Sequence, residues 1–146
     1  MELSKRLQAI ADMVTPGMIV ADVGCDHGFV SIYLYQKNIA PKVIAMDLRP
    51  GPLQRAKEHI ETFGYEAYIE TRLSDGVTAL QPGEADAMIC AGMGGRLMAK
   101  ILEDGYEKVV KVTGEITNIR PTFEEVFPKL VNPARHIDKS IAPGNI

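Results

Sequence analysis

The chain has no tryptophan, only two cysteines, and no apolar run long enough to cross a membrane. Its longest apolar runs fall far short of the roughly 20 residues that a membrane-spanning helix needs. Its first residues show no continuous apolar stretch typical of a secretory signal. Cys25 and Cys90 do not have metal-ligand spacing, so we expect free thiols and no metal. We therefore expect a cytoplasmic protein that has no membrane partner.

The sequence also lacks a strong excess of either charge. Its net charge is −3, with 46% hydrophobic and 24% charged residues, which is ordinary for a globular domain. Its 146 residues suffice for one domain with a sizeable core. Such a chain is not a general polycation, but a local basic patch can still bind a nucleic acid. Candidates, unless they are only scattered surface charges, are Lys5, Arg6, Lys42, Arg49, Arg55, Lys57, Arg96 and Lys100.

The most informative stretch is residues 20–28, where an apolar run leads into Asp22, Gly24 and Gly28. A second apolar run, over residues 42–46, ends in Asp47. A strand, a glycine turn, a helix and a strand ending in an acid describe a nucleotide-binding βαβ unit. In such a unit the second acid receives ribose hydroxyls.

The pattern of glycines narrows the class of ligand. A dinucleotide fingerprint, G-x-G-x-x-G, lets a pyrophosphate sit on the helix N-terminus. Here Asp26 stands at the second glycine position and Phe29 at the third. A carboxylate repels pyrophosphate and attracts a cation. S-adenosylmethionine fits the turn best, because it has a ribose, a sulfonium and an ammonium but no phosphate. The same spacing disfavours a nicotinamide dehydrogenase.

Hydrophobic periodicity and breaker residues predict alternating helices and strands. The expected helices are residues 3–14, capped by Ser4, then from the turn to residue 37, from Pro50 to Gly64, and from about 95 to 104. The expected strands are 18–23, 42–47, 66–73 and 86–91, the last fully buried. The inward residues of the third helix are expected to be Leu53, Ala56, Ile60 and Phe63, and those sharing one side of strand 66–73 to be Ala67, Ile69, Thr71 and Leu73.

This order predicts an α/β, Rossmann-like fold with a doubly wound, mostly parallel sheet. Ligands of such sheets bind beyond the C-terminal ends of the strands. The turn 22–28, Asp47, the Asp75-Gly76 turn and the glycine segment 92–95 all fall at these ends. The sequence therefore predicts one site at this edge of the sheet.

Three segments of the chain resemble the bacterial tRNA (adenine(22)-N1)-methyltransferase family: residues 3–11, 21–27 and 86–95. The resemblance runs from about Leu3 to Gly105. It implies a class I methyltransferase fold with S-adenosyl-L-methionine as cofactor, and N1 of an adenine in tRNA as methyl acceptor. The alternatives are a catalytically weak module that binds cofactor or RNA, and a methyltransferase with another substrate.

From Tyr106 onward the sequence departs from the family's pattern, which continues with further strands and a helical domain. We therefore expect a cofactor-binding domain over residues 1–105, in a fold incomplete at its C-terminal side. Residues 106–146 are expected to form a truncated or divergent segment, partly ordered at best. Within it, residues 106–119 are expected to form a strand or a short hairpin around Thr113-Gly114, and a poorly ordered tail is predicted over 131–146.

Residue chemistry assigns roles at the expected cofactor site. Asp47 is expected to hold the ribose diol, Leu48 to pack on the adenine, and Asp75 to accept a bond from its amino group. Gly24 would permit close backbone approach, and Asp22 would organise the loop or meet the ammonium. Plain turn or capping roles are the alternatives. The whole expected set is Asp22, Gly24, Asp26, Gly28, Asp47, Leu48, Ser74, Asp75, Gly76, Ala91, Gly92 and Met93.

The resemblance points to Asp26 and His27 as catalytic candidates beside the acceptor nitrogen. A carboxylate there would stabilise developing positive charge or accept a proton. A histidine with a purely structural hydrogen bond is the alternative for His27. The small residues from Gly92 to Gly95 would form the floor under the acceptor base.

Overall fold

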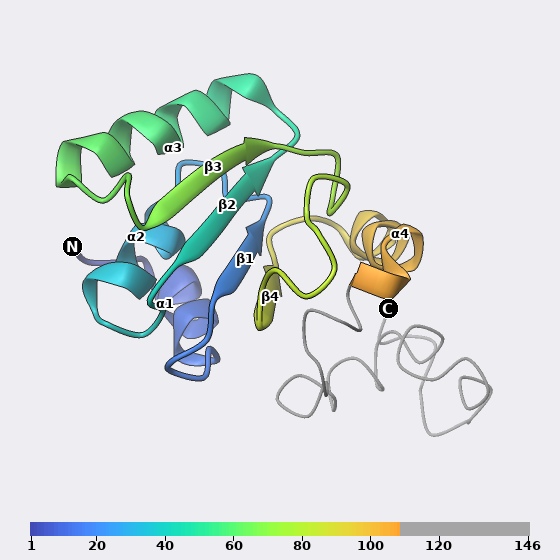
Figure 1. Ribbon diagram of the computed structural model, residues 1–146, viewed down its shortest axis with the longest axis horizontal. Helices are drawn as coiled ribbons and strands as arrows, with labels where there is room; N and C mark the ends of the chain where they lie inside the picture. Colours follow the sequence, from blue (N-terminus) through green and yellow to red (C-terminus); the bar gives the residue numbers. More distant parts are fainter. Residues whose placement is uncertain (109–146) are drawn as a thin grey trace.

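The computed structural model describes residues 1–108, which form a four-stranded parallel sheet with helices on both faces (Figure 1). The strands are β1 (Val20–Val23), β2 (Val43–Asp47), β3 (Ile69–Leu73) and β4 (Ala87–Cys90), in the order β3-β2-β1-β4. The helices are α1 (Lys5–Asp12), α2 (Phe29–Gln36), α3 (Pro50–Phe63) and α4 (Gly95–Asp104). The predicted order of elements and the α/β, doubly wound parallel fold are confirmed.

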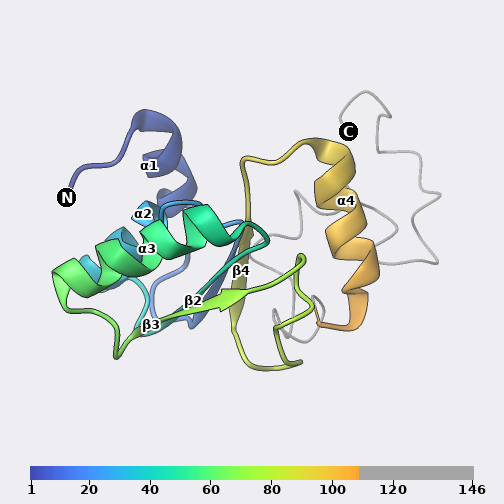
Figure 2. The same cartoon turned by 90° about the horizontal axis from the view of Figure 1, so that it is seen from above.

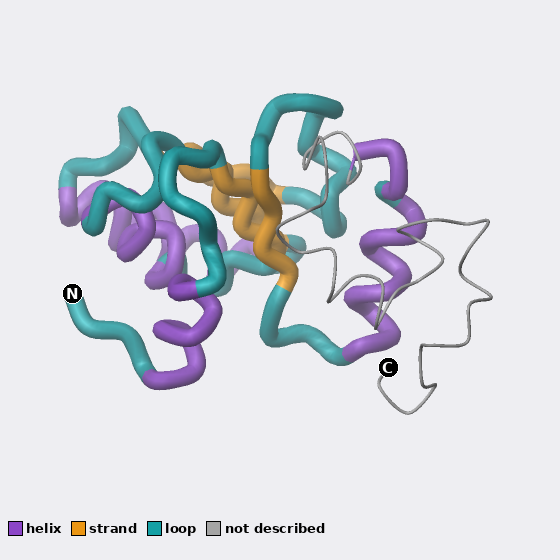
Figure 3. Tube along the Cα trace, turned by 90° about the horizontal axis from the view of Figure 1, so that it is seen from below, coloured by secondary structure: helices purple, strands orange, loops and turns teal. Residues whose placement is uncertain are grey.

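The two central strands are buried on both faces, because different helices cover each face. Helices α1, α2 and α3 lie on one side of the sheet and α4 lies on the other (Figures 2 and 3). Val43 and Ala45 of β2 pack in the core on the first side, whereas Ile44 and Met46 pack with Leu102 of α4 on the second. This alternation follows from the two-residue period of a strand.

The helix termini follow the local signals in the sequence. Ser4 caps α1, and its Oγ accepts a hydrogen bond from the Leu7 N–H at 3.3 Å. Pro50 opens α3, and Gly64 ends it with a left-handed φ of 75°. Helix α1 is shorter than the predicted 3–14. It begins at Lys5, after the Ser4 cap, and ends at Asp12.

The connection from β3 to β4 contains no helix, yet its apolar residues belong to the core. Val77, Leu80 and Ala85 are buried against the α4 side of the sheet. Arg72 of β3 ties this connection down. Its Nη1 donates to the Ala79 carbonyl at 2.9 Å and to Glu84 Oε1 at 2.7 Å, while its Nη2 also bonds the Glu84 carboxylate.

The edge strands differ in detail from the predictions. Strand β3 begins at Ile69 rather than at residue 66, and Leu73, predicted to share one side with Ile69, is 58% exposed whereas Ile69 is buried. Phe63, expected to face inward, is 41% exposed at the end of α3. Strand β4 is not fully buried, since only Met88 in it is buried. The strand residues are exposed because each edge strand has a single neighbour among the described strands, and Phe63 is exposed because it is the last residue of its helix.

The predicted hairpin around Thr113-Gly114 and the predicted tail over 131–146 lie outside the described residues. Residues 106–108, where an extended segment is predicted, are helical instead. Between residues 1 and 108, no helix has the length and apolar character required to span a bilayer.

Candidate functional site

A pocket of about 380 Å³ lies at the carboxyl edge of the sheet. Its volume falls within the about 300–1,000 Å³ that is usual for small-molecule sites. Its walls come from the segments that follow all four strands, together with α1 and α4. The topological switch point lies here, because the chain moves outward from β1 to β2 on one side and to β4 on the other.

All of the predicted site residues except Gly28 line this pocket. Gly28 is the N-cap residue of α2 and has a left-handed φ of 82°. A Cβ added to it would lie 3.0 Å from the Cβ of Ala56 in α3. The glycine therefore allows close packing of α2 against α3, and the structure gives it no place in the pocket wall.

Asp47 connects the end of β2 to the turn that follows β1. Its side chain is 3% exposed. One carboxylate oxygen accepts the Asp26 N–H at 2.9 Å, and the other accepts the Arg49 N–H at 2.9 Å. Arg49 Nε lies 3.4 Å from the second oxygen. The first of these oxygens, Oδ2, keeps a further lone pair, so this carboxylate can still accept a bond from a ligand.

Asp26 has a left-handed φ of 54° at the position where a dinucleotide fingerprint has its second glycine. Its exposed carboxylate lies 3.4 Å from Arg49 Nη2 and 3.6 Å from His27 Nε2. The turn thus presents a carboxylate, flanked by an arginine and a histidine, at the rim of the pocket. This arrangement disfavours a pyrophosphate and tolerates a cation.

Asp22 is a buried acid underneath the same turn, with 4% of its surface exposed. It accepts a hydrogen bond from Ser31 Oγ of α2 at 2.7 Å. Burial raises the pKa of Asp22 to about 6, and the nearby carboxylates of Asp47 and Asp26 add to that rise. The pocket therefore has an excess of negative charge on its β1–β2 side, which a cationic ligand would offset.

The methionine after β4 lies directly over the first glycine of the turn. A Cβ on Gly24, whose φ is 76°, would lie 2.6 Å from the Met93 methyl carbon. Cys90 Sγ is 3.7 Å from Met93 Sδ. Burial raises the pKa of the Cys90 thiol to about 12 and that of Cys25 even further, so both thiols are protonated and poorly reactive. Neither cysteine forms a disulfide, as predicted.

Sequence reasoning missed the contribution of three helices to the pocket wall. The additional lining residues are Arg6, Leu7 and Ile10 of α1, Phe29 and Val30 of α2, Leu97 and Ile101 of α4, and Val23, Cys25, Arg49 and Ile89. The guanidinium of Arg6 reaches the glycine segment, because a Cβ on Gly92 would lie 3.4 Å from its Nη1. The periodicity of α1 indicates a core-facing helix but does not indicate which end reaches a site.

The chain is similar to known proteins over most of its described length. The tRNA (adenine(22)-N(1))-methyltransferase of Bacillus subtilis is 40% identical over 109 residues, which cover 75% of this chain and 46% of that protein. The chain spans about half the length of the curated relative it matches.

Solved structures share the fold, including two that contain a bound ligand. Sp1610 of Streptococcus pneumoniae, in complex with S-adenosyl-L-methionine, is 38% identical, with a TM-score of 0.73; the match covers 76% of this chain and 52% of that one. TrmK of M. capricolum, in complex with S-adenosyl-homocysteine, is 32% identical, with a TM-score of 0.68; the match covers 73% of this chain and 49% of that one.

The family whose description is "Methyltransferase domain" matches residues 3–125, which include every strand of the sheet and every residue of the pocket wall. The fold, the switch-point pocket and this match agree, and the chain belongs to the methyltransferase-domain family.

Proposed function

We propose that this chain is the cofactor-binding part of an S-adenosyl-L-methionine-dependent tRNA (adenine-N1)-methyltransferase that acts at a position equivalent to adenine 22. The observation that carries the proposal is the hydrogen bond from the Asp26 backbone N–H to the Asp47 carboxylate at the pocket. An acid at the end of β2 suits a ribose diol, and a carboxylate in place of the second glycine suits a ligand that has no phosphate. A dehydrogenase that binds a dinucleotide would need a glycine where this chain has Asp26, and the Asp26 carboxylate would repel the pyrophosphate.

The pocket wall offers a residue for each part of this cofactor. When bound, S-adenosyl-L-methionine supplies a methyl group on a positively charged sulfonium. Asp47 would accept bonds from its ribose hydroxyls, and Leu48, which is 60% exposed, would cover the adenine face. Asp75 would bind the adenine amino group. Gly24 would let the backbone approach the methionyl part, where the charge of Asp22 attracts the ammonium.

The acceptor base would enter above the glycine segment that follows β4. Gly94 has no side chain, and nothing lies within 4 Å of the place where a Cβ would stand, so a flat ring would have room there next to the cofactor site. Asp26, whose side chain is 62% exposed, would stabilise the positive charge that develops on the acceptor nitrogen, and it or His27 would accept a proton. Positioning and exclusion of water contribute most of the rate enhancement in such a transfer.

The relatives support the cofactor and substrate of this proposal. One relative is named as a tRNA (adenine(22)-N(1))-methyltransferase, and two related structures contain S-adenosyl-L-methionine or S-adenosyl-homocysteine. A tRNA substrate implies that the target adenine becomes unstacked before transfer. A tRNA substrate also implies that the protein acts in the cytoplasm, and this location is part of the proposal.

Calorimetric titration with S-adenosylhomocysteine tests the proposal. We expect a dissociation constant in the micromolar range, about −8 kcal/mol. The absence of detectable heat at millimolar ligand would contradict it. Enhanced NADH fluorescence on mixing would support the dehydrogenase reading instead.

A second assay distinguishes an enzyme from a binding module. We expect slow or absent multiple-turnover methylation of tRNA by the 146-residue chain, because the match covers only about half of each relative. Single-turnover methyl transfer to an unmodified tRNA transcript would distinguish a slow enzyme from a module that only holds cofactor. Robust turnover would show that these residues are sufficient.

A further inference from the structure

Three aromatic rings gather at the rim of the pocket, one from the turn, one from α2 and one from α3. The Phe29 ring centroid lies 5.0 Å from that of His59 and 6.0 Å from that of His27. The His27 and His59 centroids are 6.2 Å apart. All three interplanar angles lie between 21° and 27°, so the rings face in nearly the same direction. We call His27, Phe29 and His59 the ring cluster.

The ring cluster is held in place by the backbone around it. His59 Nδ1 lies 2.8 Å from the carbonyl oxygen of His27, and this hydrogen bond joins α3 to the turn. Gly28, between two of the rings, allows α2 and α3 to approach closely. The rings therefore keep their orientation before any ligand arrives, which lowers the entropic cost of binding.

The ring cluster remains accessible, although its rings contact one another. Phe29 is 40% exposed, and the His27 side chain is 34% exposed. Both residues line the pocket, so the exposed rings continue its wall rather than lying apart from it. A single exposed phenylalanine is common, but the exposed parts of Phe29 and His27 together form an aromatic surface beside the pocket.

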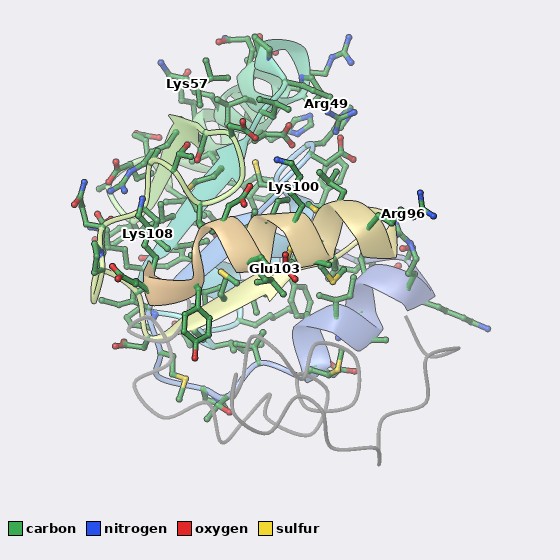
Figure 4. The ribbon with its side chains drawn as sticks, turned by 90° about the vertical axis from the view of Figure 1, so that its right-hand side faces the viewer. Arg49, Lys57, Arg96, Lys100, Glu103 and Lys108 are labelled. Carbon is green, nitrogen blue, oxygen red and sulfur yellow. The ribbon has the colours of Figure 1, made fainter. Side chains whose placement is uncertain are left out.

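Basic side chains border this surface. The Arg49 side chain is 63% exposed and pairs with Asp26 at the same rim. Arg55 lies four residues before His59 in α3 and is exposed, so the two share a helix face. Figure 4 shows Arg49 above the N-terminal half of α4 and Arg96 at the first turn of that helix. Aromatic rings bordered by cations match the chemistry of unpaired RNA, in which planar bases are carried on a chain of riboses and phosphates, and Arg49 offsets the exposed Asp26 carboxylate at this rim.

We propose that the ring cluster stacks an unpaired nucleobase of the RNA substrate at the entrance to the pocket, with Phe29 as the principal contact. The inference rests on the proposed function, because it specifies how that site would hold its RNA. Stacking does not require a particular base, since every base has a π face. Phe29 would thus position the RNA, without taking part in methyl transfer.

A titration of short RNA followed by nuclear magnetic resonance tests this inference. The probe is the five-nucleotide RNA UUAUU, compared with the same RNA having an abasic residue at its centre. The titrations use the 146-residue chain at one fixed salt concentration, because phosphate binding depends on salt. Saturating S-adenosylhomocysteine keeps the adenine of the probe out of the cofactor site.

Four variants make the test specific for stacking. Phe29→Ala and Phe29→Leu should weaken binding of UUAUU by about 10-fold, the range found for loss of one base stack. Phe29→Tyr keeps a flat ring and should stay close to the parent. Tyr68→Ala is the matched control, because Tyr68 is also in a ring contact and 47% exposed, but it precedes β3 at the amino edge of the sheet and does not line the pocket. It should bind RNA as the parent does.

The abasic RNA separates stacking from a change in folding. The parent should bind the abasic RNA about 10-fold more weakly than UUAUU. Phe29→Ala should bind the two RNAs with equal affinity, since its stacking contact is already gone. Equal binding of UUAUU by the parent and Phe29→Ala would overturn the inference, as would no binding by the parent. If either result is found while the parent still binds S-adenosylhomocysteine, the stacking inference fails and the proposed function stands. If it does not bind S-adenosylhomocysteine, the proposed function fails, and the RNA titration is judged by itself.

Discussion

The carboxylate of Asp47 accepts a hydrogen bond from the backbone N–H of Asp26, with 2.9 Å between Oδ2 and N. This bond joins the end of β2 to the turn after β1, two segments that lie side by side at the carboxyl edge of the sheet. The same side chain also receives the Arg49 N–H before α3 begins. One acid thus shapes the turn and, in our proposal, binds the ribose.

Replacing Asp47 with alanine should weaken S-adenosylhomocysteine binding by about 10- to 100-fold. Loss of charge-assisted hydrogen bonds costs about 1.5–3 kcal/mol. Calorimetric titration measures the effect. Asp86→Ala is the matched control, because Asp86 also accepts a backbone N–H, that of Ile19 at 3.0 Å, but does not line the pocket. Equal affinities of the Asp47 variant and the parent would remove Asp47 from the site.

Asp22→Asn should make the fold more stable and the cofactor site weaker. The pKa of Asp22 is about 6 in the folded chain against an ordinary value of 3.8, so its charge is unfavourable in the folded state. Removing that charge should raise the free energy of unfolding at pH 8 by about 1–3 kcal/mol, since one pKa unit corresponds to about 1.4 kcal/mol. Affinity for S-adenosylhomocysteine should fall. Urea unfolding together with calorimetry checks both effects.

The pH dependence of Asp22 has a definite sign. Between pH 4 and pH 6 the folded chain binds more protons at this residue than the unfolded chain. The contribution of Asp22 to the free energy of unfolding therefore falls as the pH rises through this window and is constant above it. The Asn variant should lack this slope. A parent and a variant with identical pH profiles would show that the pKa of Asp22 is not raised.

Gly28→Ala should destabilise the fold more than Gly64→Ala does. Both glycines have a left-handed φ, 82° and 75°, so alanine brings about 1–2 kcal/mol of backbone strain at either position. Only at Gly28 would the new Cβ also crowd Ala56, whereas nothing lies within 4 Å at Gly64. The difference between the two midpoints in chemical denaturation measures the α2–α3 packing. Equal losses would show that the helices separate without cost.

Acid should weaken the bond between Arg72 and Glu84, which holds the β3–β4 connection. Hydrogen bonds from Arg72 lower the pKa of Glu84 to about 2. Its stabilisation is therefore complete above the ordinary value of 4.5 and is lost as the pH falls from 4.5 toward 2. Glu84→Gln should cost about 1–2 kcal/mol at pH 7 and make unfolding less sensitive to acid.

The exposed Glu66 supplies the control for this ion pair. Glu66→Gln should leave the denaturation midpoint almost unchanged, since surface charges contribute little. If the two glutamine variants unfold alike at pH 7 and at pH 3, the Arg72 contact contributes nothing measurable.

Local sequence signals were sufficient for the order of the elements and for most of the pocket. Alternating apolar runs, with Ser4, Pro50 and Gly64 at the helix ends, determine where helices and strands form, because capping and periodicity act within a few residues. Asp22, Asp47 and Asp75 could be assigned to one site, because the carboxyl ends of parallel strands always meet at one edge. That part of the prediction needed no knowledge of packing.

Contacts between distant segments decided the rest. Phe63 and Leu73 are exposed because edge strands and helix ends lack neighbours, which a periodic pattern cannot reveal. Gly28 packs on Ala56 rather than lining the pocket, and His59 meets Phe29 across 30 positions of sequence, because α3 lies next to α2. The sequence by itself determined the elements and the acids at their ends. Only the tertiary structure decided which side chains share a surface, since that depends on how the helices pack against the sheet.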